Sequence, residues 1–167
     1  MKKIILALSL TFLSLSSFAQ SSSHNMSYDL SGAVGSYNGH SYTQINFGLN
    51  WYVHEHLNWR NSVFTQFGSE LNTTYGLDSS ALFGTEFYNS GRTAGIEFYA
   101  GPGVRLATEN SSAVTGTAGL TLALAGLRIG GGATYLNYFE TRHDTNHEAL
   151  PKDEVQYFIT LSGGGSF

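Results

Sequence analysis

The chain of 167 residues contains no cysteine and few charged residues. Without cysteine it can form neither a disulfide framework nor a thiolate metal site. Charged residues make up 12% of the chain, about half of the globular average. The lysines and arginines form no clustered basic patch, so we expect no nucleic-acid partner. Beyond the N-terminal segment, no apolar run approaches the roughly 20 residues of a membrane-spanning helix.

The N-terminal segment has the pattern of a secretory signal peptide. Lys2 and Lys3 precede an apolar and serine-rich stretch over residues 4–18, and Ser17-Phe18-Ala19 fits a small-x-small cleavage site. The stretch is too short for a spanning helix, which argues against an uncleaved anchor. We therefore predict a cleaved signal peptide over 1–19, a short tail over 20–27 and one domain over 28–167.

Apolar residues after the signal peptide recur at every second position, and Gly, Asn, Asp and Ser interrupt the pattern at intervals. Near the end of the chain, Val155, Tyr157, Ile159 and Leu161 alternate with small or polar residues. This is the period of a strand with one face in an apolar medium. It predicts eight strands over residues 28–37, 42–53, 59–68, 80–88, 93–106, 112–122, 127–140 and 154–167.

Three features of the composition need one explanation: the few charges, the 20 glycines and an aromatic content of 14%. A membrane β-barrel accounts for all three, because it has a lipid-facing wall, aromatic girdles, and glycines where strands bend or the interior is crowded. A soluble β-sandwich or a lipocalin-like barrel is the alternative, because it shares the alternation. We predict an all-β fold, an eight-stranded antiparallel up-and-down transmembrane β-barrel.

The predicted connections and aromatic residues are arranged by height. With the N-terminus on the periplasmic side, the longer connections over 69–79 and 141–153 lie outside the cell, as in other such barrels. Aromatic rings prefer the two membrane–water interfaces. The predicted girdle near the periplasmic rim comprises Tyr28, Trp51, Trp59, Phe87 and Phe167, and the predicted belt near the outer rim comprises Tyr37, Tyr42, Phe139 and Tyr157.

The last strand carries the most specific sequence element, Tyr157-Phe158-Ile159-Thr160-Leu161-Ser162-Gly163-Gly164-Gly165-Ser166-Phe167. On these residues the chain resembles the small eight-stranded outer-membrane barrels that include OmpX and the membrane domain of OmpA. The resemblance implies that Phe167 is a signal for the outer-membrane assembly machinery. It also implies a place in the outer membrane of a Gram-negative cell envelope, surrounded by lipid and lipopolysaccharide, and we expect the barrel to be a monomer there. Gly163 and Gly165 stand where this family usually has bulkier apolar residues.

An eight-stranded barrel is just wide enough for side chains to fill it, so we expect no open porin-like pore. Charges should face inward, because Arg or Lys facing lipid at mid-bilayer costs roughly 2–4 kcal/mol. We expect these charges to pair and fill the lumen, with a gated ion or proton path as the alternative. The predicted lumen cluster comprises Arg60, Glu86, Glu97 and Arg128 near the periplasmic end, joined by Asp29, and Arg105 and Glu140 near the outer end.

Residues that could support catalysis or bind a metal form no complete set. In His40-Ser41 the two side chains are adjacent and point to opposite faces of a strand, whereas a nucleophile and its base must lie within hydrogen-bond reach. The pairs His54 with His56 and His143 with His147 each offer two ligands, and a closed site needs about four. We therefore expect no catalytic residue, no cofactor and no metal.

Taken at the level of function, these patterns predict a non-enzymatic, integral outer-membrane protein with a side-chain-filled lumen. Its exposed loops would serve envelope integrity, adhesion or interaction. Two other classes stay open. One is a lipid A-modifying enzyme, a deacylase or acyltransferase, and the other is a narrow channel for small or hydrophobic solutes.

Overall fold

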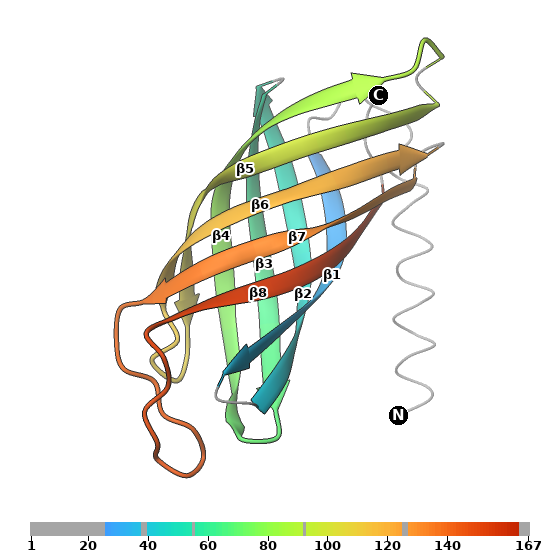
Figure 1. Ribbon diagram of the computed structural model, residues 1–167. Coiled ribbons are helices and arrows are strands. Elements are labelled where there is room, and N and C mark those ends of the chain that lie inside the picture. The colour runs from blue at the N-terminus through green and yellow to red at the C-terminus, as the bar shows by residue number, and fades with distance from the viewer. Residues whose placement is uncertain (1–25, 38–39, 55, 92, 125–126, 164–167) are drawn as a thin grey trace.

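Eight antiparallel strands form a closed barrel in the computed structural model (Figure 1). The structure describes residues 26–37, 40–54, 56–91, 93–124 and 127–163. The predicted all-β class and the strand count are therefore confirmed. The strands are β1 (Met26–Tyr37), β2 (His40–His54), β3 (Leu57–Gly68), β4 (Leu71–Tyr88), β5 (Ala94–Ala107), β6 (Ala113–Leu124), β7 (Leu127–Tyr138) and β8 (Asp153–Gly163).

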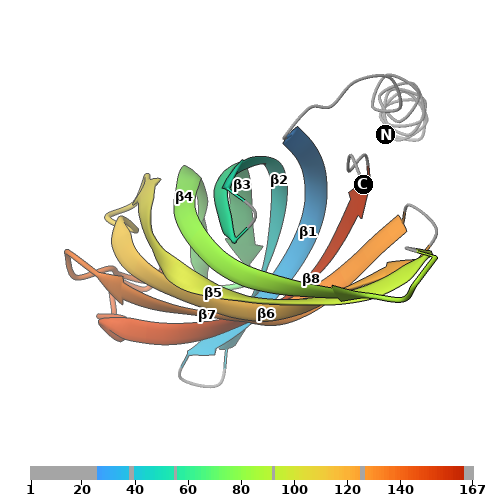
Figure 2. The ribbon, with the colours of Figure 1, turned by 90° about the horizontal axis from the view of Figure 1, so that it is seen from above.

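Each strand pairs with the next one along the chain, and β1 pairs with β8 to close the barrel. Figure 2 shows the strands curving around a common interior. β1 begins and β8 ends at the same end of the barrel, at the top of Figure 1, which we call the N/C end. The opposite end, which we call the loop end, carries the long segment between β7 and β8.

The barrel is polar inside and apolar outside, the reverse of a water-soluble globular protein. Inside, Asp29, Gln44 and Gln66 are each only 2% exposed, whereas Ile159 on the outer surface is 70% exposed. The alternation read from the sequence therefore holds, with its apolar face directed outward. Exposed large apolar side chains lie on all eight strands and include Leu30, Ile45, Val63, Phe83, Phe98, Leu120, Ile129 and Ile159.

The predicted external loop over 69–79 is wrong, because most of it belongs to β4. This strand begins at Leu71 and pairs with the end of β3 across a tight turn at residues 69–70. Its polar residues resemble a loop, but Tyr75 and Leu77 point outward and Asp78 lies inward, where its carboxylate pairs with Arg105. A polar interior thus hid a strand from a search for apolar alternation.

The ladder between β4 and β5 is interrupted at Pro102. Residue pairs run to Ser80 with Gly103 and resume at Phe83 with Ala100. Proline lacks the N–H that a ladder needs, which accounts for the break at this position. The two strands still approach closely there, because a Cβ built on Gly101 would lie 1.9 Å from the carbonyl oxygen of Ala81. Gly101 is thus required by backbone contact.

This close approach gives a testable prediction. Gly101→Ala should destabilise the barrel by about 1–3 kcal/mol, because its methyl group forces two backbones apart. Gly116→Ala is the matched control, since Gly116 pairs with Pro102 on the other side and a Cβ there meets nothing within 4 Å. Thermal unfolding in detergent, followed by gel migration, measures both variants. Equal stability of the two variants would contradict the steric role of Gly101.

Candidate functional site in the barrel interior

The N/C end of the interior contains an ion cluster around Arg128. Its guanidinium group lies 3.0 Å from a carboxylate oxygen of Glu86 and also pairs with Glu97. These residues come from β7, β4 and β5, so the contacts cross between strands that do not all share a ladder. The structure thus brings together three residues of the predicted lumen cluster.

Arg60, also predicted for this end, pairs with a different partner. Its guanidinium group donates to both carboxylate oxygens of Asp29, at 2.5 and 3.0 Å. Asn50 donates a further hydrogen bond to Asp29 at 2.7 Å. Asp29 is only 2% exposed. The bidentate contact with the Arg60 guanidinium group compensates its buried charge, and the Asn50 amide adds a neutral hydrogen bond. The two arginines of the N/C end therefore belong to separate ion groups.

At the loop end, Arg105 is fully enclosed and pairs with Asp78. Both guanidinium contacts are short, 2.7 and 2.8 Å, and Arg105 is 1% exposed. The guanidinium carbon also lies 4.3 Å from the centre of the Phe64 ring, a cation–π contact. Arg105 was predicted to lie in the lumen, whereas its partner was assigned to an external loop and so was missed.

A second group at the loop end is centred on Glu154, which sequence reasoning missed. Its carboxylate accepts hydrogen bonds from the Tyr42 hydroxyl at 2.6 Å, from the Tyr138 hydroxyl, and from Arg142 at 3.3 Å. Glu154 is 7% exposed and Tyr42 is 2% exposed. The predicted place of Tyr42 in an outer aromatic belt is therefore wrong. Its parity with the inward Gln44 was the signal that could have placed it.

Glu140 does not join these groups. β7 ends at Tyr138, and Glu140 lies beyond it as an exposed residue of the loop. The predicted strand over 127–140 was too long by two residues, and this error placed Glu140 in the lumen. The loop instead places Arg142 inward, with its guanidinium group 3.4 Å from the centre of the Tyr138 ring.

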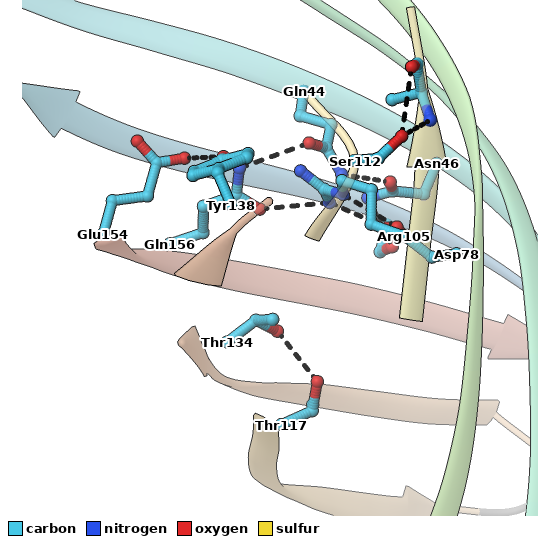
Figure 3. Close-up of polar contacts among 12 residues, drawn as sticks. Gln44, Asn46, Asp78, Arg105, Ser112, Thr117, Thr134, Tyr138, Glu154 and Gln156 are labelled. Carbon is cyan, nitrogen blue, oxygen red and sulfur yellow. Dashed lines mark hydrogen bonds and ion pairs between the residues drawn. The ribbon is translucent and has the colours of Figure 1, made fainter. Parts of the chain in front are cut away.

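Hydrogen bonds connect the Glu154 group to the Asp29 group along the length of the interior. Figure 3 shows the loop-end part, where Gln156 lies between Glu154 and Arg105. Gln156 donates to the Tyr42 hydroxyl at 2.8 Å and to Gln44 at 3.3 Å. The full series of side chains, from the loop end to the N/C end, is Arg142, Glu154, Tyr42, Gln156, Gln44, Asn46, Ser31, Arg60, Asp29, Asn50 and Asn58.

A cavity of about 40 Å³ lies near the N/C end, between the Arg60 and Arg128 groups, with Tyr52 and Tyr99 in its wall. A volume of this size holds a few water molecules and no larger solute. The described interior is thus filled by its own polar side chains.

The histidines considered as metal ligands do not form a complete ligand set. His143 forms a β-bridge with Ala149, so this part of the loop is not the helix that convergence with His147 required. The rings of His54 and His56 lie 6.1 Å apart at the N/C end. Within the described part of the chain, no three His, Asp or Glu residues are grouped as metal ligands.

The predicted periplasmic girdle lies on the outer surface near the N/C end. Trp51 and Trp59 are 50% and 43% exposed and stack on each other, with ring centres 5.9 Å apart. Phe87 is also exposed, and Tyr28 is half-buried on the same outer face. Phe167, predicted as a girdle residue and assembly signal, lies outside the described residues.

Comparison with known proteins supports the barrel fold and assigns the chain to no family. The chain matches no protein-family model and no curated protein. It is similar to the crystal structure of Neisserial surface protein A (NspA), with a TM-score of 0.56 and 10% sequence identity. The match covers 84% of this chain and 96% of that chain. At this identity the likeness shows a shared barrel fold.

The enclosed pair at the loop end gives a second prediction. Arg105→Met should destabilise the barrel by about 3–5 kcal/mol, because it leaves the Asp78 carboxylate unpaired. The double variant Arg105→Met/Asp78→Leu should recover most of this loss, since both charges are then gone. Lys152→Met, which removes an exposed cation, is the control and should change stability little. Denaturant unfolding in micelles measures all three, and no recovery in the double variant would contradict the pairing argument.

Proposed function

We propose that this protein is an integral outer-membrane barrel without enzymatic activity, whose lumen is closed by its own side chains. The observation that carries the proposal is the reversed arrangement of its two faces. Large apolar side chains cover the outside on all eight strands, while Arg105, Asp29 and Gln156 are buried inside. Only an apolar surrounding medium makes such an outer surface favourable, at roughly 25 cal/mol for each Å² of apolar area removed from water.

The aromatic residues support the same placement. Trp51 and Trp59 lie near the N/C end, whereas Tyr157 and Phe139 are exposed near the loop end, at 64% and 57%. Two aromatic levels on an outer surface are typical of membrane barrels. No helix in the described part of the chain is long and apolar enough to cross a membrane.

The proposed orientation rests on the lengths of the connections at the two ends of the barrel. We place the N/C end, with its short turns, toward the periplasm and the segment between β7 and β8 outside the cell. The signal-peptide pattern of residues 1–19 supports export. In this placement the partners of the wall are outer-membrane lipid and lipopolysaccharide, and the barrel acts as a monomer.

The loop end is the surface through which such a protein would contact other molecules. Backbone hydrogen bonds hold the segment over 139–152 in place. The Thr145 N–H donates to the carbonyl oxygen of Glu70, in the turn between β3 and β4, at 3.1 Å, and the Leu150 N–H donates to the carbonyl oxygen of Arg142, within the segment, at 2.9 Å. A loop fixed in this way presents a defined surface for envelope interactions or adhesion. The described cavity between the Arg60 and Arg128 groups, in contrast, has room only for a few water molecules.

Membrane placement predicts how charge on the outer wall is tolerated. Ile159→Lys, near the middle of β8, should reduce the amount of folded protein in the outer-membrane fraction, because a lysine facing mid-bilayer costs roughly 2–4 kcal/mol. Ile159→Leu is the matched control and should assemble normally. Heat-modifiable gel migration of the outer-membrane fraction measures both. Wild-type protein that stays soluble in the periplasm would overturn the proposal.

The closed lumen predicts the absence of ion conduction. Purified protein in a planar bilayer should show no stepwise currents, because paired side chains occupy the interior. Arg128→Met should lower heat stability through loss of the Glu86 and Glu97 contacts, with no steps appearing. Reproducible steps in the wild type would favour the channel function instead.

A further inference from the structure

We call the line along which β1 and β8 meet the seam. Its backbone ladder stops before either strand reaches the loop end of the barrel. Its last residue pair toward the loop end is Val34 with Tyr157. β1 continues to Tyr37 along β2, and β8 already begins at Asp153 along β7. At the loop end these two edges are therefore held by something other than a β1–β8 ladder.

The Tyr42 side chain crosses this seam on the inner face. Tyr42 lies on β2 and pairs with Gly35 of β1. A Cβ built on Gly35 would lie 2.1 Å from the Tyr42 hydroxyl oxygen and 2.2 Å from the ring carbon that bears it. The phenol thus lies directly over Gly35, and only the missing side chain of this glycine leaves room for it.

Beyond Gly35, the same hydroxyl group reaches β8. It donates to Glu154 at 2.6 Å and accepts from Gln156 at 2.8 Å. Leu150 of the loop belongs to the same buried hydrophobic cluster as Tyr42. The Tyr42 side chain therefore connects β2, across β1, to the unpaired start of β8, and the longer Gln156–Gln44 hydrogen bond at 3.3 Å is the weaker link between the same two strands.

A second phenol binds the same carboxylate without crossing the seam. The Tyr138 hydroxyl also donates to Glu154, but Tyr138 lies on β7, which pairs with β8 up to Asn137 and Asp153. Loss of the Tyr138 hydroxyl removes one hydrogen bond from Glu154 and leaves the β1–β8 seam bridged. The two tyrosines thus differ in which strands they join, and they share an acceptor.

We propose that Tyr42, lying over Gly35, is the main bridge that holds the loop end of the β1–β8 seam closed, and that this seam is where the barrel first opens sideways. The bridge consists of two side-chain hydrogen bonds at positions where β1 and β8 share no ladder pair. That the opening faces lipid rests on the proposed membrane placement, whereas the bridge itself does not.

A distance measurement across the seam tests the bridge directly. The native chain has no cysteine, so Ser36→Cys and Val155→Cys give a specific pair of spin labels on exposed positions at the unpaired part of the seam. In the folded protein in detergent, Tyr42→Phe should lengthen and broaden the distance between the labels. The expected shift is on the order of one strand spacing, about 4.8 Å. Gly35→Ala should act in the same direction, because its methyl group displaces the phenol.

Two controls make the result specific. Tyr138→Phe should leave the distance between labels at 36 and 155 unchanged, although it removes a hydroxyl from the same carboxylate. A label pair at Gly32→Cys and Ile159→Cys, where β1 and β8 are paired, should stay narrow in every variant. An unchanged distance in Tyr42→Phe, or equal widening in Tyr138→Phe, would overturn the proposal.

If the Tyr42 and Gly35 variants do not fold, the labelled proteins with Tyr42 and Gly35 unchanged still test the proposal. On warming below the unfolding temperature, the 36/155 pair should broaden before the 32/159 pair. Simultaneous broadening of both pairs would mean that the seam has no weaker loop end and would contradict the proposal. Failure of membrane placement would leave each of these detergent measurements unaffected, so the two proposals fail separately.

Discussion

Every guanidinium group described inside this barrel lies against a carboxylate, and the rest of the interior is arranged around these pairs. Arg60 pairs with Asp29, Arg105 with Asp78, Arg128 with Glu86 and Glu97, and Arg142 with Glu154. Removing one member would leave a buried charge unmatched, which costs far more than an exposed pair contributes. Several pairs also join strands that share no ladder, such as β1 with β3, so they fix the cross-section as well as the charge balance.

Between the ion pairs, neutral amides and hydroxyl groups form the hydrogen bonds that link one pair to the next. The side-chain amides of Gln156, Gln44 and Asn46 each form hydrogen bonds with two neighbouring side chains of the series. An amide satisfies donors and acceptors without carrying a net charge, so it costs less to bury than another ion pair. An interior of this composition favours a fixed filling over a path for ions, and it explains how a narrow barrel can be polar inside without being open.

The wall of the barrel could be predicted from the sequence, and much of the interior could not. Alternation in β2, β5, β6 and β8 depends on outward residues such as Ile45 and Ile159, which form the apolar outer face of the barrel. β4 was shortened because its inward residues are polar, and so Asp78 was missed as the partner of Arg105. Glu154 was missed for another reason: an acidic residue at the start of a strand carries no local sign that two phenols and an arginine converge on it. Pairings between distant residues follow from barrel closure, which no sequence period encodes.

The topology also has a consequence for how the barrel forms. Seven of its strand pairs join neighbours along the chain, whereas β1 and β8 pair across nearly the whole length of the sequence. Local hairpins form early at small entropic cost, and the closing pair must bring distant ends together. The β1–β8 seam is therefore expected to form last, when Tyr42 is already positioned by β2. Until then β1 and β8 each present a free edge, and the curved sheet of hairpins is the species most exposed to pairing with another chain.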